Sequence, residues 1–515
     1  MYTTKEAAQR LGISMRRVNA LIASGDLEAQ RFGRSWMLDE RSVHERAERG
    51  RTAGRPKMNE KNERNLAPFT LMNRNHPVLD FVYNRRTRET ADIVPREGIA
   101  WKPLGIGLRE RTPNRYDLAA WIASRSIPDM RPNLAPVLRE LAARHGIDLM
   151  FDSWGLNLSD QYWFKPVDID VDWHDVNYFE NGYEEALGET LLGGSAPAGT
   201  STARITHSPD TATPGMLSKT WIHRDGTNLL VKSGTGNENR EPYNELLATK
   251  LLARLLDDED FVAYSLTERH GRAYSTCPTF VTSETELIPA ADVLTAFGVT
   301  EGRDLHRGYL EAGQALGVSN LGRAVSKMIV ADHLMANFDR HTHNFGLMRE
   351  VETLDRYRVA PLFDNGCGFY SRATTDELEH GRYLWEAHPF RPYPSQQLAL
   401  VEDLSWYDSS SLDGFLDDIA DVLSLNAQLD ERFIEAVQRQ TAKQIETVND
   451  LAAERRLLFP GRERFRKEIG TMRRSPGCGC MVGTCKPAST PLQVPIVRLS
   501  RNRPTSCSWH LRRRR

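Results

Sequence analysis

The feature that most constrains this chain is a short polar stretch following a long apolar segment. Residues 336–346 read Ala-Asn-Phe-Asp-Arg-His-Thr-His-Asn-Phe-Gly, so Asp339 and Asn344 stand five positions apart. A second acidic residue, Asp364, lies 20 positions after Asn344, within residues 361–366, which read Pro-Leu-Phe-Asp-Asn-Gly. Two carboxylates and an amide are therefore available to a single site.

The interval between Asn344 and Asp364 predicts a β-hairpin. Residues 345–350 and 357–362 are two short runs typical of strands, and a polar turn separates them. A hairpin returns the chain to its starting point, so Asn344 and Asp364 are expected side by side.

This arrangement suits phosphoryl transfer, which depends on aligning the acceptor oxygen and neutralising charge on the phosphates. Asp339 would accept or orient the acceptor hydroxyl. Asn344 and Asp364 offer the hard oxygen ligands that Mg²⁺ prefers. The simpler interpretation is a polar loop whose side chains cap turns, and the Asp-x4-Asn spacing alone favours it because short motifs often match by chance. The upstream sequence decides between the two.

Upstream residues supply the parts of an ATP site. Residues 215–232 predict a loop, a strand, a tight Asp-Gly turn and a second strand that ends on Lys232. An apolar run precedes Lys232, so its stem would be packed while its ammonium meets the α- and β-phosphates. The loop and first strand add three candidates for nucleotide binding: Gly215, Ser218 and Lys219.

A helix with a suitably placed acidic residue follows. Residues 241–256 have a strong helical pattern, with Pro242 in the first turn. Glu245 lies near the helix start, where it can pair with Lys232. A lone lysine at a strand end is usually solvated. However, a hairpin, a lysine, a helix with a glutamate, Asp-x4-Asn and Asp follow one another in the order found in kinases.

These residues resemble the HipA-like serine/threonine kinases, best known as toxins of bacterial toxin-antitoxin modules. The catalytic loop of that family has the form Asn-x-Asp-x-His-x-x-Asn, which Asn337, Asp339, His341 and Asn344 fill, and residues 361–364 are similar to its metal-binding segment. The resemblance implies ATP and magnesium as cofactors, a protein serine or threonine as substrate, and a catalytic role for His341 beside Asp339.

The resemblance also implies an α+β, two-lobed kinase-like fold. It covers residues 70–450, and its specific part is residues 215–368. The glycine-rich loop departs from the family pattern, because only Gly215 stands in its expected stretch. Helices are expected at 134–145 and 324–338. The predicted divisions are a linker at 58–68, an N-terminal subdomain at 69–170 packed on the small lobe, the small lobe at 171–300, a helical large lobe at 301–460 and a tail at 461–515.

Residues 1–57 form a separate module whose capping and helix-ending residues predict a helix-turn-helix. A capping box at residues 3–6 opens one helix, and Ser14 caps a second. Residues 27–30 and 35–38 read as strands around a small wing. The module resembles the excisionase and MerR-type winged helix-turn-helix, which implies that it binds DNA.

Charge supports an interaction of this module with double-stranded DNA. Residues 1–57 hold 12 Lys+Arg against 7 Asp+Glu, and such an excess displaces counterions from phosphates. A homodimer on a palindromic operator would fit such a module. The alternative is a small protein-interaction module. The candidate DNA-contacting residues are Met15, Arg16, Arg17, Asn19 and Arg34.

The charge of the rest of the chain is unevenly distributed. Residues 461–515 hold 14 Lys+Arg against 2 Asp+Glu, whereas the whole chain has a net charge of −2, so residues 58–460 are strongly acidic. DNA contact is therefore expected only at the N-terminal module and the tail, and the tail itself is expected to be disordered. No apolar run reaches the length of about 18 residues typical of a membrane span, so we expect a cytoplasmic protein without membrane contact.

Two other classes of function stay open at this point. One is a DNA-binding transcription regulator whose kinase-like body only senses nucleotide. Retention of Lys232, Asp339, Asn344 and Asp364 argues against it, since a pseudokinase usually loses one of these groups. The other is a divalent-metal hydrolase that uses the two histidines of residues 341–343 with Asp339 and Asp364. It leaves Lys232 and the upstream hairpin without a role.

Overall fold

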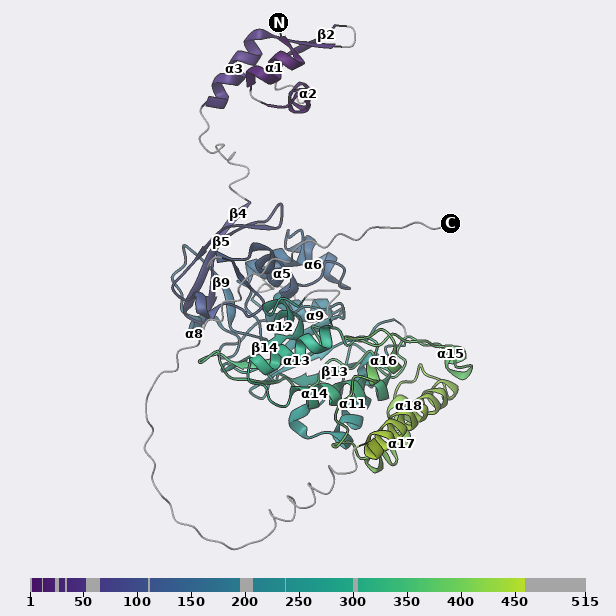
Figure 1. The fold of residues 1–515 in the computed structure, drawn as a ribbon. Helices are drawn as coiled ribbons and strands as arrows, with labels where there is room; N and C mark the ends of the chain where they lie inside the picture. The colour runs from purple at the N-terminus through teal and green to yellow at the C-terminus, as the bar shows by residue number, and fades with distance from the viewer. Residues whose placement is uncertain are drawn as a thin grey trace, which may run out of the picture. The chain divides into compact units, whose positions relative to one another are not determined.

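The structure is a computed structural model. It describes residues 2–11, 13–23, 27–32, 35–51, 65–109, 112–194, 207–236, 238–299 and 304–458. Within these residues the fold is α+β, and all the named strands pair antiparallel. Figure 1 shows the elements with the labels used below.

The N-terminal module begins with two helices in a helix-turn-helix arrangement. They are α1 (Thr4–Leu11) and α2 (Met15–Ala23). The predicted capping box is present: Glu6 N donates to Thr3 Oγ1 at 3.3 Å, and Thr3 N donates to Glu6 Oε2 at 2.8 Å. Ser14 Oγ accepts a hydrogen bond of 3.3 Å from the first turn of α2, as its capping role predicts.

A small sheet and a third helix complete this module. The strands lie in the order β1 (Tyr2–Thr3), β3 (Ser35–Leu38) and β2 (Ala29–Phe32). The strand predicted from Leu27 begins two residues later, at Ala29, which is the first residue that pairs with β3. The Leu27 side chain is buried in the core of the module. Neither β1 nor α3 (Glu40–Arg51) was expected from the sequence pattern.

A four-stranded sheet forms the centre of residues 65–166. Its order is β6 (Glu89–Pro95), β5 (His76–Asn84), β4 (Leu66–Asn73) and β9 (Tyr162–Pro166). Apolar side chains of β4, β5 and β9 form one core with α5 (Arg115–Arg125) and α7 (Gly146–Asp152). The short elements of residues 99–212 are η1 (Ile99–Trp101), β7 (Leu108–Arg109), β8 (Thr112–Pro113), α6 (Leu134–Glu140), α8 (Trp173–Val176), α9 (Ala186–Leu191) and η2 (Pro209–Ala212).

The prediction of one helix over residues 134–145 is wrong for the second half of that range. Helix α6 ends at Glu140, and α7 begins only at Gly146. Ala142 between them has φ 53°, in the left-handed region, so the α-helix cannot continue through it. Asp148 then caps α7 by accepting a hydrogen bond of 3.1 Å from His145 N.

The predicted hairpin of residues 219–232 belongs to a second four-stranded sheet. The strand order is β10 (Lys219–Arg224), β11 (Thr227–Lys232), β13 (Arg272–Pro278) and β12 (Ser265–Arg269). Asp225 and Gly226, with φ of 50° and 77°, make the tight turn between β10 and β11. The predicted helix with Pro242 in its first turn is α11 (Glu241–Leu255).

The second predicted hairpin is also present. β15 (Gly346–Glu350) pairs with β16 (Tyr357–Val359), with Leu347 opposite Val359, and β14 (Thr285–Pro289) pairs with the other edge of β15. The buried helix predicted over 324–338 is α14 (Leu321–Met335). It ends earlier than predicted because Ala336 has φ 50° and turns the chain out of the helix.

Helices dominate the rest of the described chain (Figure 1). Side chains of α11, α14, α17 and α18 share the largest apolar core. Among the described residues, no helix combines the length and the apolar composition needed to span a membrane. The remaining elements are η3 (Asp258–Asp260), α12 (Ala290–Ala296), α13 (Leu305–Ala315), α15 (Thr375–Glu379), α16 (Pro394–Leu398), η4 (Ser409–Leu412), α17 (Phe415–Leu423) and α18 (Glu431–Leu458).

Candidate active site

The loop after α14 holds Asp339 in a fixed backbone geometry. Asn337 is fully buried, and its Nδ2 donates to Asp332 Oδ1 at 2.9 Å. Its Oδ1 accepts a hydrogen bond of 3.1 Å from Asp339 N. Because Asp332 belongs to the buried helix α14, the position of Asp339 is tied to the core.

A buried arginine joins this loop to the segment around Asp364. Arg340 has an exposed fraction of 0% and forms an ion pair with Asp332 at 2.9 Å. Its Nη1 donates to the carbonyl oxygens of Asn344 at 2.8 Å and Phe363 at 2.6 Å. Burial alone would lower the pKa of Arg340, but the Asp332 carboxylate raises it, so the guanidinium stays charged.

Arg340 therefore contacts the backbone of Asn344 and of Phe363, the residue before Asp364, and links the two segments that carry the predicted metal ligands. Asn344 is buried, and its Nδ2 donates to the carbonyl oxygen of Asp339 at 2.9 Å. Within the described residues, its side-chain oxygen accepts no hydrogen bond. Asp364 has φ 58°, a strained backbone for a residue with a side chain, which is common at functional sites.

Lys232 is the centre of the charged cluster on the other side of the site. Its Nζ donates to Glu245 Oε1 and to Asp364 Oδ1, both at 2.5 Å. Lys232 has an exposed fraction of 2% and Glu245 of 1%. The backbone N–H of Asn365 donates to the second oxygen of Glu245 at 3.0 Å. The predicted pairing of Lys232 with Glu245 is thus present, and Lys232 also pairs with Asp364.

Electrostatics favours the charged forms of Lys232 and Asp364, whereas burial raises the pKa of Glu245. Burial would lower the pKa of Lys232, but the carboxylates of Asp364 and Glu245 raise it well above its ordinary value. Burial would likewise raise the pKa of Asp364, but the charges of Lys232 and Lys219 lower it well below its usual range. A charged carboxylate at position 364 is the form that can bind a metal ion.

The loop of residues 213–218, called the covering loop below, and the hairpin β10–β11 bring a second lysine to the cluster. Lys219 is the cross-strand partner of Lys232 and is buried. Gly215 has φ 100°, and a Cβ there would lie 2.6 Å from Lys219 Nζ, so a larger residue would displace the lysine. Burial lowers the pKa of Lys219 to about 8. Ser218 is buried, and its carbonyl accepts a hydrogen bond of 2.9 Å from Ser233 N.

An arginine from residues 65–166 holds this loop. Arg131 is buried, and its Nε donates to the carbonyl oxygen of Gly215 at 2.8 Å. Its Nη2 donates to the same oxygen at 2.6 Å and to the carbonyl oxygen of Thr213 at 2.5 Å. The conformation of the covering loop therefore depends on a side chain more than 80 positions upstream.

His341 is not brought to the carboxylate of Asp339. The imidazole is exposed, and its Nδ1 lies 3.2 Å from the backbone N–H of His343. The Asp339 carboxylate is instead contacted by Cys367, whose Sγ donates to Asp339 Oδ2 at 3.7 Å. Burial, followed by the Asp339 charge, raises the pKa of Cys367 well above its usual range, so the thiol is protonated and can donate.

Sequence reasoning missed Arg131, Arg340 and Cys367. The only signal for Arg340 was its position next to Asp339 in the motif. Its contacts with the Phe363 carbonyl and Asn365 depend on tertiary folding. Arg131 lies in a segment without a recognisable motif, so nothing in its sequence neighbourhood indicated a role at the covering loop.

The candidate DNA-contacting residues lie on the exposed side of α2. Met15 has an exposed fraction of 54%, and the other three candidates on this helix, Arg16, Arg17 and Asn19, are exposed as well. Val18, between them, is buried in the core of the module. Arg34, the candidate at the wing tip, lies outside the described residues, as do residues 52–64 and the predicted tail at 461–515.

The residues of this site fit a magnesium ion bound with a nucleotide. Asp364 contributes a charged carboxylate and Asn344 an amide oxygen, which are hard ligands. Such a site normally takes its remaining ligands from phosphates and water, so two protein ligands suffice. Lys232 and Lys219 add two buried lysines, which are cross-strand partners, to the same cluster.

Comparison with known proteins finds matches to a helix-turn-helix domain and to a protein kinase. Residues 1–51 match the sequence family described as the helix-turn-helix domain. The chain is 46% identical over 46 residues to the serine/threonine-protein kinase CtkA of Helicobacter pylori (strain J99). That match covers 9% of this chain and 14% of the relative, so the chain matches only about a seventh of the length of CtkA.

The solved structures that are similar to the chain include the following two. A crystal structure of the Helicobacter pylori proinflammatory kinase CtkA has a TM-score of 0.36 and 18% identity, over 46% of this chain and 94% of that chain. A chain of the Shewanella oneidensis MR-1 toxin-antitoxin complex of HipA, HipB and operator DNA has a TM-score of 0.45 and 14% identity, over 74% of this chain and 97% of that chain. The chain is thus similar to the kinase CtkA over a short segment, and its described residues combine an α+β fold with an N-terminal helix-turn-helix domain.

Proposed function

We propose that this chain is a HipA-like serine/threonine protein kinase that transfers the γ-phosphate of ATP to a protein hydroxyl, in a magnesium-dependent reaction. The observation that carries the proposal is the contact of Lys232 with both Glu245 and Asp364, beside the loop that holds Asp339 and Asn344. A kinase needs these groups together to bind the phosphates and orient the acceptor. We expect it to act in the cytoplasm.

Each group has a defined task in this reaction. Lys232, held by Glu245, meets the α- and β-phosphates, and Lys219 adds a second positive charge. Asn344 and Asp364 would hold a magnesium ion, which would neutralise phosphate charge. Asp339 orients the serine or threonine hydroxyl and accepts its proton. Arg340 acts at a distance by fixing the backbone on both sides of the metal ligands.

We further propose that the N-terminal module binds double-stranded DNA through the exposed side of α2. Arg16 and Arg17 are exposed there and can reach phosphates or base edges. A kinase fused to an operator-binding domain would carry its own transcriptional regulator, a role related to toxin-antitoxin modules. A homodimer would present two such helices to a palindromic operator.

Radiolabelled ATP and the purified full-length chain test the kinase assignment. Phosphate transfer to the chain itself or to proteins of a cell extract is expected for the wild type, and Asp339→Ala should lower the rate by about 10²-fold or more. Asp364→Asn should instead raise the magnesium concentration needed for half-maximal rate. Asp355→Ala, an exposed carboxylate in the β15–β16 turn, is the matched control and should be fully active.

The alternatives give different results in the same experiment. A nucleotide-sensing regulator without catalytic activity would bind ATP but transfer no phosphate in any variant. A metal-dependent hydrolase would lose activity on substitution of His341 and His343 and keep it in Lys232→Met. Equal transfer by the wild type and Asp339→Ala would remove the catalytic assignment.

A further inference from the structure

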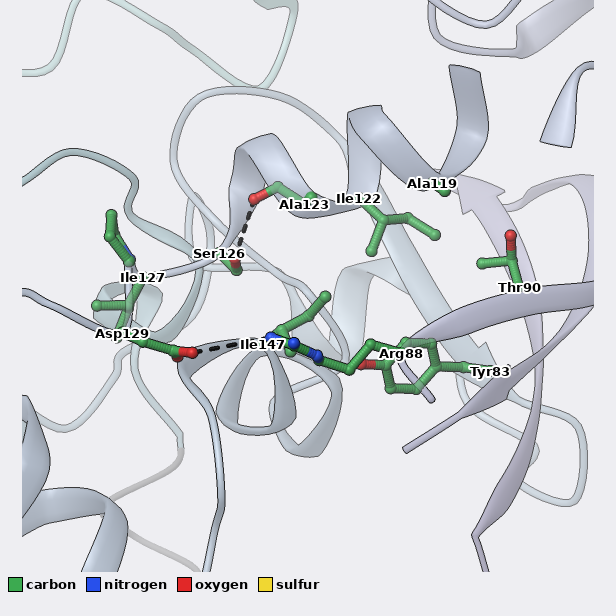
Figure 2. A pocket seen from close by; sticks show the side chains of 11 residues that line it. Tyr83, Arg88, Thr90, Ala119, Ile122, Ala123, Ser126, Ile127, Asp129 and Ile147 are labelled. Carbon is green, nitrogen blue, oxygen red and sulfur yellow. Dashed lines mark hydrogen bonds and ion pairs between the residues drawn. The ribbon is translucent and has the colours of Figure 1, made fainter. Parts of the chain in front are cut away.

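A cavity lies within residues 65–166, away from the residues of the candidate active site. It has a volume of about 310 Å³ and lies between the β5–β6 hairpin, α5 and the start of α7 (Figure 2). This size is at the lower end of pockets that bind small molecules. None of the residues assigned to ATP, magnesium or DNA lines it. The residues that define its chemistry are Tyr83, Arg88, Ile122, Ile127, Asp129 and Ile147.

One wall of the cavity is apolar, and the other carries an unsatisfied hydroxyl. Ile122, Ile127 and Ile147 provide the apolar wall. Tyr83 has an exposed fraction of 1%, and its hydroxyl has no hydrogen-bond partner within the described residues. Its ring is fixed by stacking on Phe151, with ring centroids 4.0 Å apart. Buried polar groups are normally paired, so this hydroxyl points to a ligand that supplies an acceptor.

A loosely paired cation lies at the same cavity. The Arg88 guanidinium is half-exposed, and its ion pair to Asp129 is 3.9 Å long. In Figure 2 the Tyr83 ring and the Arg88 side chain enter the cavity from the same direction, and the ion pair to Asp129 crosses it. The Asp129 carboxylate is already bound by His145 Nδ1 at 2.7 Å and by Gly146 N at 2.8 Å. Arg88 can therefore turn to another anion.

We propose that this cavity binds a small aliphatic carboxylate. The carboxylate accepts hydrogen bonds from Arg88, in the two-pronged geometry that guanidinium favours, and from the Tyr83 hydroxyl. The aliphatic part packs against Ile122, Ile127 and Ile147. The charges of Asp148 and Asp129 act on the Tyr83 hydroxyl, and those of Arg85 and Arg88 oppose them.

Isothermal titration of the full-length chain with N-acetyl-leucine tests the proposal, with the neutral isostere N-acetyl-leucinamide as the matched ligand. Saturable binding of the acid is expected, with the amide at least tenfold weaker. Arg88→Gln and Tyr83→Phe should each weaken the acid at least fivefold. Arg86→Gln, an exposed neighbour that does not line the cavity, should leave binding unchanged.

Stability measurements provide an independent readout. Without ligand, Tyr83→Phe should keep or raise the melting temperature, because it removes an unpaired hydroxyl and keeps the ring. A fall of several degrees would show that the hydroxyl has a partner and would overturn the proposal. Equal binding of acid and amide, no binding of either, or an equal loss in Arg86→Gln would also overturn it. Neither readout depends on kinase activity, so a failure here leaves the proposed function intact.

Discussion

At the residue scale, the candidate active site depends on charged side chains that the fold removes from water. Lys232 and Arg340 are both buried, and each has carboxylate partners at 2.9 Å or less. Lys232 faces the expected nucleotide, whereas Arg340 faces the backbone of the two segments that carry the metal ligands. Arg340 therefore fixes the backbone of the segments that carry Asn344 and Asp364.

Replacement of Arg340 by methionine should destabilise the protein strongly. The change leaves Asp332 buried without its cation and removes hydrogen bonds to the carbonyl oxygens of Asn344 and Phe363. Removal of one partner of a buried ion pair lowers the free energy of unfolding by about 3–5 kcal/mol. Urea unfolding measures this loss. Arg356→Met, which removes an exposed ion pair, should change it by less than about 1 kcal/mol.

Lys219 predicts a dependence of nucleotide affinity on pH. Burial lowers its pKa to about 8, so the side chain is charged below pH 8 and becomes neutral as the pH rises above it. The Kd for ATP should therefore rise by up to about tenfold between pH 7 and pH 9, as one charge-assisted hydrogen bond is lost. Titration with a fluorescent ATP analogue at both pH values measures it. In Lys219→Arg the affinity should stay constant, because arginine remains charged over this range. The same rise in Kd in this variant would assign the titration to another group.

At the scale of elements, the hairpin β10–β11 and the hairpin β15–β16 deliver the site residues. Each carries its functional residue at or beside a strand end: Lys232 at the end of β11, and Asn344 two positions before β15. The loop before β10 is held from outside the sheet by Arg131, whose hydrogen bonds go to the carbonyl oxygens of Thr213 and Gly215. The subdomain with sheet β6-β5-β4-β9 thus fixes the conformation of the covering loop.

Arg131→Ala should release this loop and weaken nucleotide binding. We expect faster hydrogen exchange in residues 213–218 and a KM for ATP raised by about tenfold, with a smaller change in kcat, because the arginine orients the loop and does not touch the acceptor. Arg131→Lys should lower the KM for ATP only part of the way back to the wild-type value, since an ammonium cannot reproduce the forked contacts of the guanidinium. Arg139→Ala, on the exposed side of α6, is the control. Unchanged hydrogen exchange in Arg131→Ala would remove this role.

At the scale of the whole molecule, the chain combines a basic N-terminal module with an acidic body. The module has its own apolar core, made by Ala7, Val18, Leu27, Leu38 and Val43 among others, none of which belongs to the cores of the body. A module with a separate core can fold without its neighbour. DNA binding and phosphate transfer are therefore expected to be separable.

Deletion of residues 1–57 should abolish specific operator binding and leave phosphate transfer measurable. In the full chain, Arg16→Ala and Arg17→Ala should weaken DNA binding, and only a base-contacting residue should also relax sequence preference. Gel-shift titrations at fixed salt compare these proteins, because phosphate contacts depend steeply on ionic strength. If residues 58–460 shift the same operator as the full chain, the DNA-binding module has been assigned wrongly.

The sequence by itself determined the local parts of this protein. Strand alternation, an Asp-Gly turn and capping residues predicted both hairpins, α11, α14 and the first two helices of the N-terminal module, because these patterns depend on residues a few positions apart. The same logic predicted that Asn344 and Asp364 meet, since a hairpin returns the chain to its start. The predicted ends of two helices were wrong because a residue with positive φ, Ala142 or Ala336, ends the helix earlier than the pattern indicates.

Only the tertiary structure decided which distant side chains complete the site. Arg131 lies 84 positions from Gly215, and the pairing of Lys232 with Asp364 spans 132 positions. Contacts of this kind leave no periodic signal, because they depend on how whole elements pack. The same holds for the cavity at Tyr83 and Arg88, whose walls come from β5, α5 and α7. Local chemistry is encoded in neighbouring residues, whereas burial and long-range pairing arise only when the elements assemble.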